Sequence, residues 1–258
     1  MIPFFKYEGA GNDFVIIDDR QKSFDETDVH LVQRMCDRHF GIGADGLMLL
    51  RLIEGYDFEM VYFNSDGRPS SMCGNGGRCL VAFAHRLGLI GSETRFVAVD
   101  GSHQASWISD SEVSLEMIDV KQIEVISPKE LLMDTGSPHY VIWSENIDQI
   151  DLIAAAREIR YSPRFEKEGV NVNFIEKTAE GIKIRTYERG VEDETLACGT
   201  GVTAAAIAAN FWGIAQNSVK VSAVGGNLSV NFEVEGLSFR HVWKTGPVKE
   251  VFQGNFLP

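Results

Sequence analysis

Hydrophobic and polar residues follow two different periods along this chain. Alternation at every second position, or a short apolar run, predicts strands at residues 4–8, 13–18, 58–67, 112–118, 139–143, 181–190 and 228–234. Apolar residues at every third or fourth position predict amphipathic helices at 28–39 and 151–160. Because the strands outnumber the helices and short turns join many of them, the pattern indicates an α+β fold with antiparallel sheets.

A third helix has an apolar residue on nearly every face. It follows Cys198 and reads "GVTAAAIAANFWG", residues 201–213. A helix of this kind must be enclosed by protein on all sides, as in a sheet that curls around it. The weakly polar run at 202–216 is too short to cross a bilayer.

The chain repeats itself at a fixed offset of 125 residues. Two stretches carry the repeat most clearly, "SSMCGNGGRCL" around Cys73 and "LACGTGVTAAAIAAN" around Cys198. The offset also relates Gly74 to Gly199, Gly76 to Gly201, Gly88 to Gly213, Gly101 to Gly226 and Gly11 to Gly136, and a slip of one residue pairs Asn64 with Glu188. Such self-similarity indicates two pseudo-symmetric domains, each an antiparallel β-sheet or barrel wrapped around a central helix, with the boundary near residue 117 and the second domain ending near 246.

Composition narrows the possible partners. The 258 residues are 44% hydrophobic and carry a formal net charge of −13, which argues against nucleic acid and anionic membranes as partners. The first twenty residues contain no apolar signal core, so a cytoplasmic protein is expected. Four cysteines without a C-x-x-C spacing form neither a disulfide framework nor a common zinc site.

Cys73 and Cys198 each precede a glycine turn that opens a helix. Unpaired N–H groups at a helix start favour a thiolate and can cradle a carboxylate. If the two halves face each other, one thiolate could remove an α-proton while the other thiol protonates the opposite face. Cys79 has no counterpart in the second half, where Ala204 stands, and Cys36 lies in the first amphipathic helix. We interpret both as structural.

At these motifs the chain resembles diaminopimelate epimerase over essentially its whole length. The segments that carry the resemblance are "KYEGAGNDFVIID", "GIGADGL", "FNSDGRPSSMCGNGGRC", "GSPHYV", "GVNVNF" and "YERGVEDETLACGTG". The resemblance implies a homodimeric enzyme with no metal and no cofactor, pyridoxal phosphate included. Such an enzyme interconverts LL- and meso-2,6-diaminopimelate in lysine and peptidoglycan precursor synthesis. It also implies that residues 247–258 return to the first domain, giving domains of 1–117 plus 247–258 and 118–246.

The resemblance assigns a role to individual residues. Cys73 and Cys198 would be the two acid/base residues, and His139 and Glu188 would tune their protonation. The residues expected to bind substrate are Asn12, Asn64, Gly74, Asn75, Asn171, Glu188, Arg189, Gly199 and Thr200. Their chemistry suits a substrate with two ammonium and two carboxylate groups, since arginine grips carboxylates and asparagine both donates and accepts.

Two positions depart from the family pattern. Ser137 stands where many members have asparagine, and Gly46 stands where some have glutamine. A serine is shorter, so a bridging water could replace a direct substrate contact there. Gly46 can contribute no side chain at all.

The sequence leaves four alternatives open. A proline racemase-like enzyme shares the two-thiol logic, but Glu188 and Arg189 favour a longer, doubly zwitterionic substrate. A phenazine-biosynthesis-like isomerase would share the fold but lack the thiol pair. A redox switch could join Cys73 to Cys198, although the missing C-x-x-C weighs against it. An amino-acid-binding module without turnover would leave both thiols without a purpose.

Overall fold

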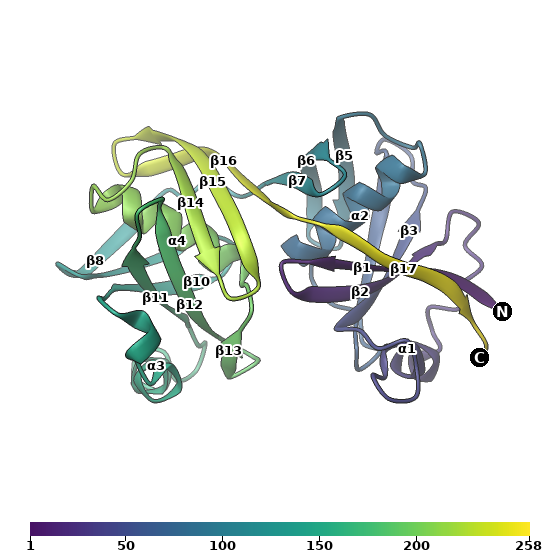
Figure 1. The fold of residues 1–258 in the computed structure, drawn as a ribbon, viewed down its shortest axis with the longest axis horizontal. Coiled ribbons are helices and arrows are strands. Elements are labelled where there is room, and N and C mark those ends of the chain that lie inside the picture. Colours follow the sequence, from purple (N-terminus) through teal and green to yellow (C-terminus); the bar gives the residue numbers. More distant parts are fainter. The chain divides into compact units, whose positions relative to one another are not determined.

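The computed structural model describes all 258 residues, which fold into two compact units (Figure 1). The first unit comprises Met1–Leu115 with Gly246–Pro258, and the second comprises Glu116–Thr245. No helix combines the length and the apolar character needed to cross a membrane. The boundaries predicted from the sequence, at 117 and 246, stay a prediction.

Strands dominate both units. The elements of the first unit are β1 (Ile2–Gly9), β2 (Asn12–Asp18), α1 (Val29–Cys36), β3 (Gly46–Arg51), β4 (Phe58–Asn64), α2 (Gly74–Arg86), β5 (Glu93–Ala98), β6 (Gly101–Ser109), β7 (Glu112–Glu116) and β17 (Lys249–Phe256). Those of the second are β8 (Ile123–Ser127), β9 (Glu130–Asp134), β10 (Pro138–Trp143), the 3₁₀ helix η1 (Ile147–Gln149), α3 (Leu152–Arg160), β11 (Asn171–Lys177), β12 (Ile182–Glu188), β13 (Asp193–Thr195), α4 (Gly199–Phe211), β14 (Ser218–Ala223), β15 (Gly226–Glu235) and β16 (Ser238–Pro247).

The two units pair their strands in the same order and the same directions. In the first, β2 runs parallel to β3, β3 antiparallel to β4, β4 parallel to β5, and β5 antiparallel to β6. In the second, β10, β11, β12, β14 and β15 repeat this sequence of pairings one for one. The register repeats too, since Phe14 faces Gly46 and, 125 residues later, His139 faces Asn171. The predicted α+β class and duplicated architecture are therefore confirmed.

The sheets are mixed, whereas the sequence pattern indicated antiparallel pairing. The parallel pairs arise where a helix lies between two strands in the chain. In the first unit α1 connects β2 to β3 and α2 connects β4 to β5, and α3 and α4 do the same in the second. A helical crossover carries the chain back to the end of the sheet at which the previous strand began, so the next strand runs parallel to it.

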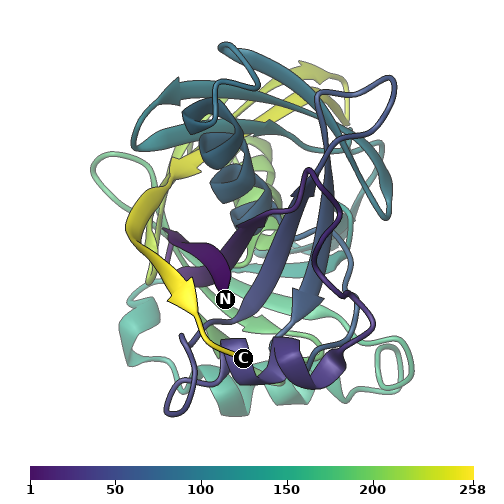
Figure 2. The ribbon, with the colours of Figure 1, turned by 90° about the vertical axis from the view of Figure 1, so that its right-hand side faces the viewer.

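Each unit has one central helix. The first unit's α2 lies against β1, β2, β3, β4 and β6 (Figure 2), and α4 lies against β9, β10, β11, β12, β14 and β15. All residues of α4 from Gly201 to Ala209 are buried, as its apolar sequence predicted. The peripheral helices α1 and α3 begin after Asp28 and Asp151, whose carboxylates accept from the N–H of Leu31 and Ala154.

The central helices also end alike. Gly88 and Gly213 follow α2 and α4 with φ of +70° and +69°, a left-handed conformation that glycine adopts without strain. Gly88 donates to His85 O at 2.9 Å, and Gly213 donates to Asn210 O at 2.9 Å. The duplication therefore extends to single hydrogen bonds at the helix ends.

Candidate functional site

Cys73 and Cys198 are the N-cap residues of α2 and α4. Their backbones are extended, with φ and ψ of −103° and 118° at Cys73 and of −83° and 115° at Cys198. The cysteine carbonyls accept the first intrahelical bonds, from Gly77 N at 2.7 Å and from Val202 N at 2.9 Å. The N–H groups of the first helical turn precede these bonds and are the donors that can hold an anion.

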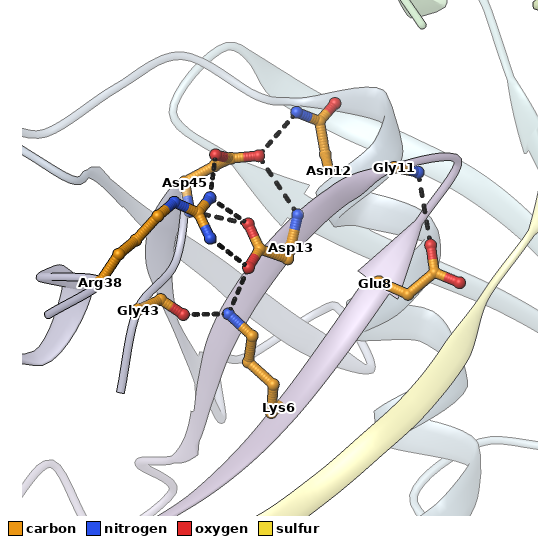
Figure 3. A network of polar contacts seen from close by, with 8 residues as sticks. All are labelled: Lys6, Glu8, Gly11, Asn12, Asp13, Arg38, Gly43 and Asp45. Carbon is orange, nitrogen blue, oxygen red and sulfur yellow. Dashed lines mark hydrogen bonds and ion pairs between the residues drawn. The ribbon is translucent and has the colours of Figure 1, made fainter. Parts of the chain in front are cut away.

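In the first unit a chain of amide side chains leads away from the start of α2. Arg78 Nη2 donates to Asn75 Oδ1 at 2.9 Å, and Asn75 Nδ2 donates to Asn12 Oδ1 at 2.6 Å. Asn12 Nδ2 in turn donates to Asp45 Oδ2 at 2.9 Å (Figure 3). Because each group is a donor at one end and an acceptor at the other, the chain fixes the orientation of both amides.

Charged side chains hold Asp45, the last member of this series of hydrogen bonds, in place (Figure 3). Arg38 donates to Asp13 and to Asp45, each at 2.7 Å, and Lys6 donates to Asp13 at 2.6 Å and to the carbonyl of Gly43. Burial alone would raise the pKa of Asp13, but the hydrogen bonds from Arg38 and Lys6 outweigh it and lower the pKa to about 2. The network therefore holds the end of the loop before β3 against β1 and β2.

Asn64 ends β4 and is exposed, opposite Gly46 on β3. A Cβ atom on residue 46 would lie 2.5 Å from Tyr62 Cε2 and 2.5 Å from Phe63 O, so no side chain fits there. The Tyr62 ring instead occupies this space, with its hydroxyl 3.0 Å from the same point. Residue 46 is therefore a glycine because the side chain of Tyr62 fills the space that a side chain at position 46 would need.

In the second unit a hydrogen-bonded relay leads to the Cys198 sulfur. His139 Nε2 lies 2.8 Å from Thr200 Oγ1, which lies 3.5 Å from Cys198 Sγ. On the other side of the ring, Asn173 Nδ2 lies 3.0 Å from His139 Nδ1, and Asn173 Oδ1 accepts from Thr186. Asn173 must therefore donate to Nδ1, which leaves the ring proton on Nε2 to be donated to Thr200 and lets Thr200 donate to sulfur.

His139 is fully buried and stays neutral. Burial lowers the pKa of His139 to about 3, with the hydrogen bond to Asn173 acting in the opposite direction. A neutral ring with a fixed tautomer orients Thr200 without adding a charge beside Cys198.

The Cys198 thiol is buried and lies beside the carboxyl of Glu188. Burial and the Glu188 carboxylate raise the pKa of Cys198 to about 11, although Thr200, the Gly201 N–H and Lys244 favour the thiolate. Burial likewise raises the pKa of Glu188, against the effect of hydrogen bonds from Thr195 and Cys198. At neutral pH the arrangement therefore holds Cys198 as a thiol that is hydrogen-bonded to the carboxyl group of Glu188.

Lys244 brings a cation to the start of α4. Its side chain is fully buried, and its Nζ lies so close to Gly199 that a Cβ atom on residue 199 would clash with it. Any side chain at position 199 would therefore force the ammonium group to move from this place.

Ser137 connects two of the residues expected to bind substrate. Asn171 Nδ2 donates to Ser137 Oγ at 2.9 Å, and Arg189 Nη2 donates to the same oxygen at 3.3 Å. Arg189 N also donates to Asn171 Oδ1 at 2.9 Å, and Arg189 Nη1 donates to Glu168 O at 2.8 Å. The exposed guanidinium is thereby fixed at the end of β12.

The two remaining cysteines are buried away from these helix starts. Cys36 packs in the core between α1 and the sheet of the first unit, and burial raises its pKa to about 12. Cys79 is fully buried inside α2, where burial also raises its pKa. Both thiols are held neutral and act as small apolar side chains.

Comparison with known proteins agrees with these motifs. A family profile described as diaminopimelate epimerase matches residues 4–123 and 131–251. The diaminopimelate epimerase of Flavobacterium psychrophilum is 46% identical over 251 residues, covering 96% of this chain and 98% of that protein. The diaminopimelate epimerase of Chlorobaculum tepidum is 42% identical over 256 residues, covering 95% and 98%. This chain belongs to the diaminopimelate epimerase family.

Solved structures show how widely the fold is shared. A PhzF-family phenazine biosynthesis protein of Bacillus anthracis is similar with a TM-score of 0.73 at 14% identity, covering 100% of this chain and 99% of that one. A probable proline racemase of Agrobacterium radiobacter gives a TM-score of 0.67 at 17% identity, covering 100% and 93%. At such identities the likeness extends to the fold alone. The family resemblance seen in the sequence is confirmed, and the fold belongs to a broader set of two-domain proteins.

Within each unit the structure groups the residues predicted for a diaminopimelate epimerase. In the first, Asn12 and Asn75 are joined by a hydrogen bond beside Cys73 and Gly74, while Asn64 stands apart at the end of β4. In the second, the residues joined to one another directly or through Thr200 and Ser137 are His139, Asn171, Glu188, Arg189 and Cys198. Their roles toward a substrate stay a prediction.

Sequence reasoning missed three members of these networks. Arg78, Asn173 and Lys244 are all fully buried polar residues near a helix start. Arg78 gave one usable signal, since it is the single cation within the glycine-rich and apolar first turns of α2. Lys244 gave none, because only the folded strand β16 brings it to Gly199.

Proposed function

We propose that this protein interconverts LL- and meso-2,6-diaminopimelate without a cofactor, using Cys73 and Cys198 as a pair of acid/base residues. Membership of the diaminopimelate epimerase family supports the reaction. The observation that carries the proposal is that the same structural position, the N-cap of a central helix, holds a cysteine in both halves. Packing alone does not require cysteine at both positions.

The proposed reaction is a proton exchange at one stereocentre. One cysteine, as thiolate, takes the α-proton from one face of the substrate, and the other, as thiol, gives a proton to the opposite face. The negative charge that develops on the substrate carboxylate is stabilised by the N–H groups at the two helix starts. Each turnover leaves the two sulfurs with exchanged protonation states, so the reverse reaction begins from the opposite arrangement.

The remaining predicted residues would recognise the ends of the substrate. Gly74, Asn75, Gly199 and Thr200 would present the helix-start donors to the reacting carboxylate. The groups proposed to hold the other ammonium and carboxylate groups are Asn12, Asn64, Asn171, Glu188 and Arg189. Arg189 supports this role because Ser137 and Glu168 already fix its exposed guanidinium.

The pathway, location and assembly follow from the family and stay proposals. The reaction would supply meso-diaminopimelate for lysine and peptidoglycan precursors in the cytoplasm. We also propose a homodimer, which sedimentation equilibrium of the purified protein tests directly. A monomer at micromolar concentrations would contradict that assembly and leave the chemistry untouched.

The experiment that tests the function is an activity assay in deuterated water. Purified protein with reductant and without pyridoxal phosphate is incubated with LL-diaminopimelate, and the α-hydrogen and the stereochemistry are followed by NMR and chiral chromatography. We expect formation of the meso isomer with deuterium at the inverted centre. Proline and glutamate serve as control substrates and should remain unchanged. Absence of exchange with diaminopimelate would exclude the proposed function.

A further inference from the structure

The guanidinium of Arg78 is buried without a carboxylate partner. The side chain is fully buried in α2 and forms no ion pair. Its Nη1 donates to Gly74 O at 3.4 Å and its Nη2 to Asn75 Oδ1 at 2.9 Å, while Nε has no hydrogen-bond partner. Burial of an uncompensated charge is very unfavourable, so a group of this kind calls for a nearby anion.

The contacts of Arg78 point toward the N-terminus of α2. Gly74 and Asn75 form the first turn of the helix, and Cys73 is its N-cap. The guanidinium therefore adds a full positive charge to the helix end that already carries the unpaired N–H groups. Burial lowers the pKa of Arg78, but arginine stays protonated in proteins at neutral pH.

Few groups near this helix start can carry the matching negative charge. The groups that act on Arg78 are Cys79, Cys73 and Glu8, and Tyr62 also interacts with Cys73. Burial raises the pKa of both Cys79 and Tyr62, so neither is ionised at neutral pH. The Glu8 carboxylate accepts from Gly11 N at 3.3 Å (Figure 3), and it acts on Arg78 more weakly than Cys73 does. Cys73 is the remaining candidate, and it is only half-buried.

The equivalent position in the second half carries no charge. Thr203 lies 125 residues after Arg78 and donates through Oγ1 to Gly199 O at 3.2 Å. That bond matches the one from Arg78 to Gly74 O, since both reach the carbonyl four residues earlier. The first half thus has a guanidinium where the second has a hydroxyl. The second half has a cation of its own, Lys244, but burial and the carboxyl of Glu188 outweigh it and raise the pKa of Cys198.

We propose that Arg78 is a positioning residue that keeps Cys73 as the thiolate in the resting enzyme and orients Asn75 beside it. Cys73 is then the base that starts turnover and becomes a thiol, and Cys198 is the thiol that donates its proton and becomes a thiolate. Transfer of a proton back from Cys73 to Cys198 restores the resting state. This assignment rests on the proposed two-thiol function.

The test measures thiol reactivity without substrate, so it does not depend on turnover. The full-length protein is treated with iodoacetamide at a series of pH values, and alkylation of each cysteine is followed by peptide mass spectrometry. In the unmodified protein we expect Cys73 to react faster than Cys198 at pH 7. Faster reaction of Cys198 would overturn the proposal, and this result needs no variant.

Substitutions of Arg78 test whether its positive charge controls the reactivity of Cys73. Arg78→Met, of similar length and without charge, should move the midpoint of the Cys73 alkylation profile upward by about one pH unit or more. Its rate at pH 7 should fall about tenfold, with the Cys198 profile unchanged. Arg78→Lys keeps the charge and should retain most of the reactivity. Thr203→Val, at the equivalent position of the second half, is the matched control and should leave the Cys73 profile as it is.

Thermal melting separates this role from a structural one. Replacing a buried charge with an apolar side chain of similar volume is often neutral or stabilising, so Arg78→Met should melt no lower than the unmodified protein. A folded Arg78→Met protein with an unshifted Cys73 profile would overturn the proposal, and Arg78→Gln provides a second neutral variant if methionine is not tolerated. Epimerisation by the unmodified protein, measured separately, shows whether the proposed function stands when this assignment fails.

Discussion

The starts of α2 and α4 have the same backbone and different side chains. Both helices are capped by a cysteine, and both end in a glycine of left-handed conformation. The positions around them differ in pairs: Asn12 and Ser137, Phe14 and His139, Gly46 and Asn171, Asn64 and Glu188, Asn75 and Thr200, Arg78 and Thr203. The duplicated backbone thus provides two equivalent helix starts, and the substitutions make the two cysteines chemically unequal.

The pair Phe14 and His139 shows this most clearly. A Cβ atom on Gly76 would lie 3.4 Å from Phe14 Cζ, and one on Gly201 would lie 3.4 Å from His139 Cε1. The two rings therefore pack against the same point of their helices. Only the second ring has nitrogen atoms, so only Cys198 is connected to a histidine relay. A two-base epimerase needs such inequality, since one sulfur must begin as thiolate and the other as thiol.

The largest effect should come from removing one sulfur. Cys73→Ala and Cys198→Ala should each reduce epimerisation by at least about 10³-fold, because each removes the proton carrier of one face. Cys198→Ala should still exchange the α-hydrogen with deuterated water, since Cys73 can remove and return a proton on its own face. Cys79→Ala is the matched control on the same helix and should keep its activity. Normal turnover by Cys198→Ala would require a one-base mechanism.

The second effect concerns the histidine relay and acid stability. Burial places the pKa of His139 at about 3, below its unfolded value of 6.5. The free energy of unfolding should therefore be highest above pH 6.5 and should fall by a few kcal/mol as the pH drops toward 3, because the unfolded chain then binds a proton that the folded protein does not. His139→Gln should flatten the fall in melting temperature between pH 6.5 and pH 3. His30→Gln, at an exposed histidine, is the control and should leave the slope unchanged. An equally steep fall in His139→Gln would contradict the buried neutral ring.

The third effect concerns the carboxyl group of Glu188, whose equivalent in the first half is the uncharged Asn64. Because burial raises the pKa of Glu188, its contribution to folding is present at low pH and is lost as the pH rises through the folded-state value. Glu188→Gln should therefore melt higher than the unmodified protein at pH 8, with the difference shrinking toward pH 4. Its turnover should fall by about 10²-fold, as removal of an acid/base partner predicts. Unchanged turnover would place Glu188 outside the chemistry.

The smallest effect should be the same in both halves. Gly88→Ala and Gly213→Ala put a side chain into a left-handed conformation with open space around it, so each should cost about 1 kcal/mol of unfolding free energy. Chemical denaturation measures both values. A difference of twofold or more would show that the two scaffolds are not equivalent.

The sequence predicted the repeated features well. The offset of 125 residues located both cysteines at helix starts, and aspartates before apolar periods located the starts of α1 and α3. These features depend on neighbours in the chain, which a sequence displays directly. The parallel strand pairs were not predicted, because they depend on where each helical crossover returns.

The contacts that distinguish the two halves could not be predicted. That Tyr62 fills the space above Gly46, and that Ser137 joins Asn171 to Arg189, follows from side-chain directions across neighbouring strands. Arg78 is adjacent to Cys79 in the sequence, but the direction of its guanidinium is set by packing inside the folded unit. Alignment of the two halves identifies the positions that differ, but only the folded structure shows which side chains are in contact there.

A crystal structure with a bound diaminopimelate analogue tests the central claim most directly. We expect the sulfurs of Cys73 and Cys198 within van der Waals distance of the α-carbon, one on each face, with its carboxylate on the N–H groups of both helix starts. A complex with both sulfurs on one face, or with either sulfur remote from that carbon, would contradict the account.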